Sequence, residues 1–346
     1  MNERKFFGLT MAGIIVLVLL IASFTFGVSM YKEKDDRIFT TVTDREYNSI
    51  LARRFPYNAA ILGSSMCQGF RCSDFDREFG CQALKMTCSA ANFAEVKFMA
   101  EYASRFQKLD YVIFDLRCVF LGFEQTLDNM PLESYSDRVI WYRLKKSFSI
   151  NALMAEWEFF SKRIRGKVKY VSRDEIYDWN KKHPCGEKYF AREILFKERY
   201  PYRTDAAYRD LCAATLDTYV IPLLQELPET EFHIFFPPFS MMFYMGLDPA
   251  EYIALKQMVI DRLLPMKNLV LHDFEIAFPI MENFENYKDL THYSGKISSR
   301  MVTAMKTREF QLTPENKEDH LRKLQSQIAS FDYQKEFDRL KQTYRK

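Results

Sequence analysis

The sequence predicts an α/β fold in which helices cover both faces of a mostly parallel sheet, giving three α/β/α layers. Short apolar runs alternate along the chain with longer amphipathic stretches, a pattern typical of strands that are joined by helices. Parallel strands need such crossovers, because a tight turn cannot return the chain to the same end of the sheet. Ligands bind at the carboxyl ends of strands in these sheets, so the residues that follow each run are candidate site residues.

Five apolar runs are the expected strands, namely residues 59–62, 83–86, 111–114, 232–236 and 269–272. The amphipathic stretches between them, such as residues 94–105 and 206–227, are the expected helices. His233 and His272 fall inside the last two runs, where packing in the core is the expected role of a histidine.

The chain is expected to have four parts. A tail and a membrane anchor occupy residues 1–30, and a polar linker that leads into a short helix occupies residues 31–54. The α/β domain follows at residues 55–310, with a helical insertion at about 120–203 that is rich in Trp, Tyr, Phe, Lys and Arg. Residues 311–346 are charged and carry apolar residues at helical spacing, which predicts an amphipathic C-terminal helix.

The N-terminal apolar stretch predicts a transmembrane helix. Phe6 to Val28 is a run of 23 residues without a charge, and as a helix it would span roughly 30 Å of hydrocarbon. A cleaved signal peptide is the alternative, although this run exceeds the usual apolar core of a signal peptide. Arg4 and Lys5 precede the run, and long domains cross the membrane largely regardless of charge. The expected location is therefore a single-pass position in the cell membrane, with the N-terminus cytoplasmic and the domain outside.

Charge and cysteine content give no indication of a nucleic-acid-binding protein or of a zinc protein. Lys and Arg total 49 against 46 acidic residues, a net charge of +3 that does not predict a nucleic-acid surface. The seven cysteines form no C-x-x-C pair and no Cys/His array with zinc spacing, so no metal site is expected and no disulfide pairing follows. No cofactor motif is visible in the sequence.

Gly63-Ser64-Ser65 follows the first predicted strand directly. Glycine allows a sharp strand-to-helix turn there, and a serine hydroxyl at that turn projects at the carboxyl edge of the sheet. Ser65 is therefore a candidate nucleophile. The alternative is a structural role, because Gly-Ser-Ser is also an ordinary turn and helix cap.

Asp289 stands three residues before His292, after the last predicted strand. At this spacing a carboxylate can bond one imidazole nitrogen while the other faces a serine hydroxyl, which fixes the tautomer and stabilises the imidazolium. No other histidine of the chain has an aspartate at this spacing. A doubly wound sheet can bring the two motifs together, so Ser65, Asp289 and His292 are the predicted catalytic residues.

The order of these motifs resembles the SGNH hydrolases, also called GDSL-like hydrolases. In that superfamily the serine block lies near the start, and D-x-x-H near the end, of a flavodoxin-like α/β/α domain. Three segments look like membrane-anchored SGNH-like envelope proteins related to the DltD group: Ile61-Leu62-Gly63-Ser64-Ser65, Phe235-Phe236-Pro237-Pro238 and Asn286-Tyr287-Lys288-Asp289-Leu290-Thr291-His292-Tyr293-Ser294. Ser64 stands where the common G-D-S version has Asp.

The oxyanion hole departs from the family pattern. These enzymes use a glycine N–H and an asparagine side chain besides the N–H of the serine, and neither is plainly present here. The candidate donors are Ser65, Ala90, Asn92 and Arg117, where Ala90 would replace the glycine N–H. Arg117 is either a cationic donor or a structural arginine in an ion pair. Because loss of one donor costs about 10²- to 10³-fold in rate, a weakened or specialised enzyme is one outcome.

The resemblance implies a bacterial extracytoplasmic serine esterase or acyltransferase that acts on acetyl or alanyl groups of cell-envelope polysaccharide. A membrane-bound O-acyltransferase is the implied protein partner, and no nucleic acid is expected to bind. The missing asparagine motivates an alternative: an inactive SGNH-like accessory protein that binds an envelope polymer or a membrane acyltransferase. A third alternative is a structural domain in which the three side chains do not converge.

Overall fold

The computed structural model describes residues 3–32, 43–138, 172–196 and 202–345, together with scattered positions between 141 and 165. The chain divides into two compact units. One comprises Met1–Ile50 and Met130–Ser172, and the other comprises Leu51–Asn129 and Arg173–Lys346. The second unit contains every strand of the sheet described below.

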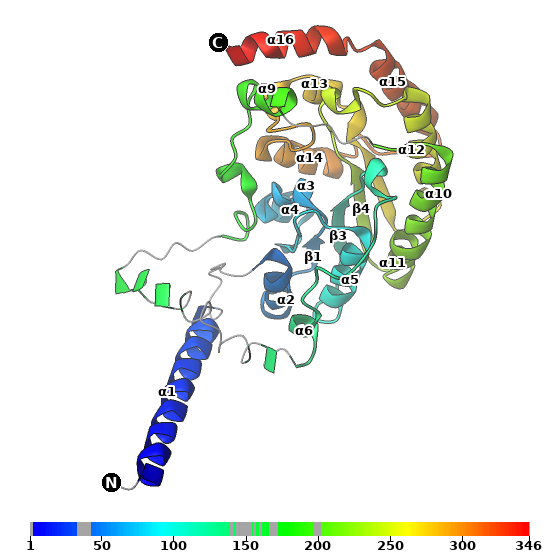
Figure 1. The fold of residues 1–346 in the computed structure, drawn as a ribbon. Helices are drawn as coiled ribbons and strands as arrows, with labels where there is room; N and C mark the ends of the chain where they lie inside the picture. The colour runs from blue at the N-terminus through cyan, green and yellow to red at the C-terminus, as the bar shows by residue number, and fades with distance from the viewer. Residues whose placement is uncertain are drawn as a thin grey trace. The chain divides into compact units, whose positions relative to one another are not determined.

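A five-stranded parallel sheet forms the centre of the second unit (Figure 1). Its order is β2-β1-β3-β4-β5, and every neighbouring pair is parallel. The strands are β1 (Ala59–Ile61), β2 (Ala83–Lys85), β3 (Tyr111–Asp115), β4 (Glu231–Phe236) and β5 (Leu269–Asp273). Each predicted apolar run matches one of them to within one residue at each end, so the prediction of an α/β fold with a parallel sheet is confirmed.

The strands are apolar because both faces of the sheet are covered. Nearly every strand residue is buried, as expected for parallel strands between helical layers. Lys85 is one of a few buried polar residues in these strands, and it is fully buried in β2. Its ammonium group donates to the carbonyl oxygens of Gln68, Phe70 and Asp174 at 2.8, 2.8 and 2.9 Å, which satisfies all three of its N–H groups.

The helices lie in two groups, one on each side of the sheet (Figure 1). On one side α4 (Cys72–Phe79) packs against α14 (Gly295–Thr307). On the other side lie α5, α10, a π-helical turn, α11 and α12: Phe93–Ser104, Ala206–Thr215, Leu216–Val220, Ile221–Glu226 and Pro249–Leu263. The chain changes direction across the sheet between β2 and β3, which makes the edge between β1 and β3 the topological switch point.

The remaining short elements of the second unit follow strands or connect helices. They are α3 (Ser65–Gln68), η1 (Cys118–Phe120), η2 (Trp179–Lys181), α9 (Glu187–Phe196), η4 (Met241–Tyr244), η5 (Phe274–Ile276), α13 (Phe278–Met281) and η6 (Phe284–Asn286). Much of the predicted insertion lies outside the described residues. Its described residues include η1, η2 and α9, together with α6 (Leu132–Tyr135) of the first unit.

The predicted single C-terminal helix is two helices in the structure. α15 (Lys317–Ser330) packs against α12, and α16 (Tyr333–Arg345) packs against α9. Phe331 adopts an extended backbone that ends α15, and the Asp332 carboxylate accepts a bond from the Lys335 N–H at 3.0 Å. A helix-capping aspartate therefore starts a new helix where the apolar spacing alone predicted continuation.

The first unit contains α1 (Glu3–Lys32) and the start of α2, which runs from Asp44 to Arg54. Among the residues that the structure describes, we find no helix whose length and apolar character would let it span a bilayer. Residues 33–42 of the predicted linker lie outside the described residues.

His233 and His272 are buried, as their position inside strands predicts. The Nδ1 atom of His233 lies 3.0 Å from the Nε2 atom of His272, and its Nε2 atom lies 2.8 Å from the Glu231 carboxylate. Burial lowers the pKa of both imidazoles, so the pair belongs to the neutral core.

Candidate active site

Ser65 is the first residue of α3 and follows β1 through a tight turn. The hydroxyl of Ser64 caps α3 by accepting a bond from the Met66 N–H at 3.2 Å. Gly63 has φ +93°, and a Cβ atom there would lie 2.4 Å from the Asp115 carboxylate. Glycine is required at this position for two reasons: the backbone has a positive φ, and Asp115 occupies the space that a Cβ atom would need.

Asp115 ends β3 beside this turn and is almost completely buried. Its carboxylate accepts bonds from the backbone N–H of Ser64 at 2.7 Å and from the Ser64 hydroxyl at 2.8 Å. The Nε atom of Arg117 lies 2.8 Å from Oδ2 of Asp115, the oxygen that also accepts the Ser64 hydroxyl bond, and the guanidinium balances the charge. Asp115 was not among the predicted site residues, although an acidic residue at the carboxyl end of a strand beside the switch point is a usable signal.

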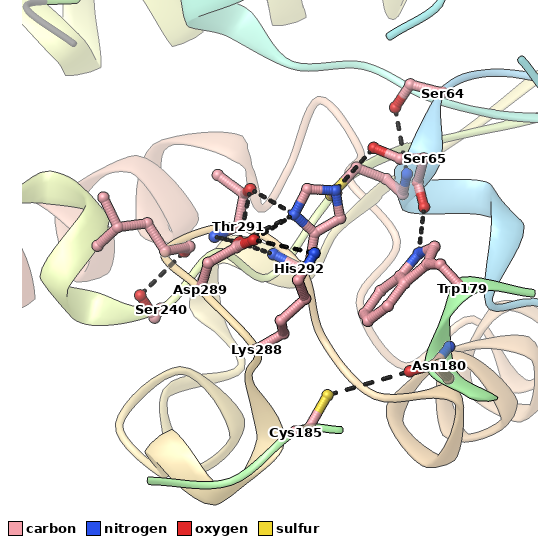
Figure 2. A network of polar contacts seen from close by, with 12 residues as sticks. Ser64, Ser65, Trp179, Asn180, Cys185, Ser240, Lys288, Asp289, Thr291 and His292 are labelled. Carbon is pink, nitrogen blue, oxygen red and sulfur yellow. Dashed lines mark hydrogen bonds and ion pairs between the residues drawn. The ribbon is translucent and has the colours of Figure 1, made fainter. Parts of the chain in front are cut away.

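His292 and Asp289 lie on a loop after β5, opposite the Ser65 turn (Figure 2). The Nε2 atom of His292 is 2.8 Å from the Ser65 hydroxyl oxygen, and its Nδ1 atom is 2.9 Å from both oxygens of Asp289. Because a carboxylate only accepts, Nδ1 carries the proton and the Nε2 lone pair faces Ser65. The structure therefore brings the three predicted catalytic side chains into one hydrogen-bonded line.

The Asp289 carboxylate is held by the backbone as well as by the imidazole. It accepts bonds from the N–H groups of Thr291 at 3.0 Å and His292 at 2.9 Å. Burial would raise the pKa of Asp289, but the bonds from the His292 ring and from these N–H groups lower it below its usual range. Asp289 is consequently an anion throughout the neutral range, able to stabilise a positive charge on His292.

Neighbouring loops fix the Asp289–His292 loop in place. The Tyr293 hydroxyl donates to the carbonyl oxygen of Met66 at 3.0 Å, which joins this loop to α3. The Tyr287 hydroxyl donates to the Pro238 carbonyl at 2.6 Å, and the Ser240 N–H donates to the Leu290 carbonyl at 3.0 Å. The Pro237-Pro238 loop after β4 thus supports the loop that carries the histidine.

Trp179 approaches the same line from the insertion. Its indole N–H donates to the carbonyl oxygen of Ser65 at 3.1 Å, and its ring stands edge to face with the His292 ring, with centroids 5.2 Å apart (Figure 2). The sequence places Trp179 in the insertion that is rich in aromatic residues, without a predicted role in the site. No periodic pattern distinguishes it from Trp141 and Trp157, so its contact with the triad needs the structure.

The predicted oxyanion donors differ in their surroundings. Ala90 has φ +53°, a left-handed conformation at the position where the SGNH pattern has glycine. Among the described residues we find no hydrogen bond from the backbone N–H of Ser65 or of Ala90. These two groups are therefore available to donate to an oxyanion.

The side chains of Asn92 and Arg117 are engaged elsewhere. Asn92 caps α5 by accepting a bond from the Glu95 N–H at 2.9 Å, and its amide donates to the Thr126 carbonyl at 2.7 Å. Arg117 pairs with Asp115 and donates to the Ala91 carbonyl at 2.7 Å. Neither side chain is aligned as a donor in this state, and Arg117 has the contacts of the structural alternative.

Within the described ranges, no group of His, Cys, Asp and Glu side chains could hold a metal ion. A cavity of about 420 Å³ lies at the opposite edge of the sheet, at the amino ends of β4 and β5, with Glu231, Lys267 and Arg308 in its wall. The triad geometry, and not this cavity, locates the candidate chemistry.

The sequence matches no protein-family model and no curated protein. Support for a function therefore comes from the geometry of the site.

Proposed function

We propose that the chain is an SGNH-like serine esterase or acyltransferase with Ser65 as nucleophile, His292 as general base and Asp289 as its orienting carboxylate. The observation that carries the proposal is the line from Ser65 through His292 to Asp289, with separations of 2.8 and 2.9 Å. A serine activated by an adjacent, oriented base is the arrangement that acyl transfer through a covalent intermediate needs.

The reaction would begin when Ser65 attacks the carbonyl carbon of an ester while its proton moves to Nε2 of His292. The Asp289 anion stabilises the resulting imidazolium, and the N–H groups of Ser65 and Ala90 donate hydrogen bonds to the tetrahedral oxyanion. Collapse breaks the ester bond, and His292 returns the proton to the departing alcohol. Water or a polymer hydroxyl then attacks the acyl-Ser65 ester, with His292 again taking the proton.

The proposed substrates are acyl groups, such as acetyl or alanyl esters, on polysaccharide of the bacterial cell envelope. This part of the proposal comes from the likeness to DltD-related envelope proteins in the sequence motifs. A membrane-bound O-acyltransferase as partner and a position at the cell membrane, with the domain outside the cytoplasm, stay predictions from the sequence.

One observation favours the alternative of a non-catalytic accessory protein. The two side chains that could complete an oxyanion hole, Asn92 and Arg117, already have other partners. Without a third donor, the rate would fall by about 10²- to 10³-fold, and in this alternative the domain serves as a binding surface.

Hydrolysis of p-nitrophenyl acetate by the purified full chain tests the proposal. We expect release of p-nitrophenol that falls to the background rate in Ser65→Ala, a loss of about 10³-fold or more. Ser104→Ala is the matched control, because Ser104 ends α5 and only bonds the Glu101 carbonyl. Equal rates for the wild type and Ser65→Ala would refute the proposal. Faster release of the acyl group with chitohexaose, together with acylated sugar in the mass spectrum, would identify a transferase.

A further inference from the structure

We propose that Trp179 is a positioning residue of the triad. Its side chain keeps the nucleophile Ser65 and the base His292 aligned with each other. This inference rests on the proposed function, since it assigns Trp179 a part in the same reaction. Ser65 and His292 are 227 residues apart in the chain, and the covalent chain between them leaves their alignment open.

Trp179 contacts both partners of the Ser65–His292 bond. Its indole N–H holds the Ser65 carbonyl at 3.1 Å, which fixes the first turn of α3. Its ring stands at 83° to the His292 ring with centroids 5.2 Å apart, a favourable edge-to-face geometry. Lys288 places its ammonium group 5.5 Å from the centre of the indole ring. Tilting of the imidazole out of line with Ser65 is therefore opposed by a rigid neighbour.

Asp289 alone does not supply this constraint. Its carboxylate fixes the Nδ1 end of the imidazole, but an imidazole held at one nitrogen can still pivot and move Nε2 away from the hydroxyl oxygen. Proton transfer depends steeply on this alignment, and a displacement of about 1 Å can cost about 10²-fold in rate. The Trp179 ring lies where it limits that pivot (Figure 2).

The segment that carries Trp179 is anchored firmly to the sheet. We call residues 173–180 the site strap. Arg173 donates to the Ala83 carbonyl at 2.9 Å, and the Asp174 carboxylate accepts bonds from the backbone and hydroxyl of Ser73 at 2.8 and 2.6 Å. The Asp174 carbonyl also accepts a bond from the buried ammonium of Lys85 at 2.9 Å. A lysine with no access to solvent is thus used to hold the strap beside the triad.

Asn180 anchors the other end of the strap between the two halves of the site. Its side-chain oxygen accepts a bond from the Gly295 N–H at 3.2 Å. A Cβ atom at Gly69 would lie 3.1 Å from the Asn180 amide nitrogen, so the glycine leaves room for this side chain. Gly295 follows the loop of His292, and the Trp179 indole bonds the Ser65 carbonyl, so the strap is bonded to both sides of the site.

Tryptophan fluorescence tests the contact without any enzyme assay. Trp141 and Trp157 are well exposed, and their replacement by Phe leaves Trp179 as the sole tryptophan of a chain that has three. In that background, His292→Gln removes the imidazole ring that the indole contacts, so the wavelength or intensity of the Trp179 emission should change. An emission spectrum that is the same with and without the His292 ring would overturn the proposed contact.

Labelling by a fluorophosphonate and hydrolysis of p-nitrophenyl acetate test the positioning role. We expect Trp179→Phe, which loses the N–H bond and part of the ring but keeps an aromatic side chain, to slow labelling by about threefold to tenfold, and Trp179→Ala by about 10- to 100-fold. The loss should appear in kcat with KM unchanged, and Trp141→Phe should match the wild type. Thermal unfolding midpoints near the wild-type value exclude misfolding, and the Phe variant keeps the test valid if the Ala variant is unstable.

The outcomes separate the two proposals. A wild-type chain that labels, with both Trp179 variants labelling equally fast, would overturn the positioning role and leave the proposed function intact. A wild-type chain that does not label, although its Trp179 emission reports His292, would refute the proposed function. That result would also end the positioning role, because no reaction would remain for Trp179 to support.

Discussion

The Asp115 carboxylate accepts hydrogen bonds from both the backbone N–H and the hydroxyl of Ser64, at 2.7 and 2.8 Å. This carboxylate comes from the end of β3 and holds the turn at the end of β1, one residue before the candidate nucleophile. The Cys67 thiol also approaches it, at 3.3 Å. Asp115, at the switch point of the sheet, therefore holds the turn from which the Ser65 side chain projects.

Replacing Asp115 by Asn tests this role. The amide keeps one acceptor but loses the charge, so the Ser64 turn loses one bond and the largely buried Arg117 loses its ionic partner. Breaking a buried charged pair is strongly destabilising, and we expect a loss of about 3 kcal/mol in the free energy of unfolding. Labelling of Ser65 should also slow by about tenfold or more. Denaturant unfolding and labelling kinetics measure the two effects.

Asp248→Asn is the matched control for that variant. Asp248 caps α12 through a bond to the Glu251 N–H at 3.0 Å, and asparagine caps helices about as well as aspartate. Its effect on stability should be under about 0.5 kcal/mol. Similar losses in the two variants would mean that Asp115 has no special part in the site.

Gly63→Ala and Gly246→Ala separate backbone strain from steric clash. Both glycines have a positive φ, at +93° and +90°, but only Gly63 has neighbours where a Cβ atom would stand. Strain should cost each variant about 1–3 kcal/mol in unfolding free energy. Gly63→Ala should lose at least about 1 kcal/mol more, because its methyl group meets Asp115. Equal losses by chemical unfolding would contradict the packing described at Asp115.

The stability contribution of Asp289 should depend on pH. Its pKa in the folded chain is lowered below the ordinary value of 3.8 by the His292 ring and the loop N–H groups, against the opposing effect of burial. A lowered folded-state pKa gives stability that is fully present above about pH 5 and is lost as pH falls below 3.8. The difference in unfolding free energy between the wild type and Asp289→Asn should therefore shrink in acid. A difference that stays constant from about pH 6 to pH 2.5 in denaturant unfolding would contradict this.

Asn92→Asp tests whether the Asn92 side chain serves the reaction. Aspartate keeps the cap of α5 but cannot donate to the Thr126 carbonyl, so a modest loss of stability of about 1 kcal/mol is expected. The rate of p-nitrophenyl acetate hydrolysis should stay within about twofold of the wild type, whereas loss of a working oxyanion donor costs about 10²- to 10³-fold. A rate loss of that size with intact folding would identify the Asn92 side chain as an oxyanion donor.

The sheet was predictable because its strands are short apolar runs between helical stretches. Burial on both faces makes that pattern strong, and each of the five runs overlaps a strand of the structure. The break between α15 and α16 was not predicted, because the apolar spacing of the C-terminal segment continues across Phe331. A cap at Asp332 interrupts the helix without changing that spacing.

The candidate triad was predictable from two local motifs, but its surroundings were not. Gly63-Ser64-Ser65 and Asp289-x-x-His292 each have a short-range signature, and the parallel sheet limits where they meet. Asp115, Trp179 and Lys85 act across 51, 114 and 89 residues of chain, respectively, so no local pattern joins them to their partners. Such contacts depend on tertiary packing.

The most direct test of the central claim is covalent labelling of Ser65 by a fluorophosphonate in folded, purified protein, followed by intact-mass measurement and peptide mapping. We expect one adduct per chain on Ser65, absent from Ser65→Ala and strongly slowed in His292→Gln. A folded wild-type chain that stays unmodified, or an adduct that persists in Ser65→Ala, would contradict an activated serine at this site.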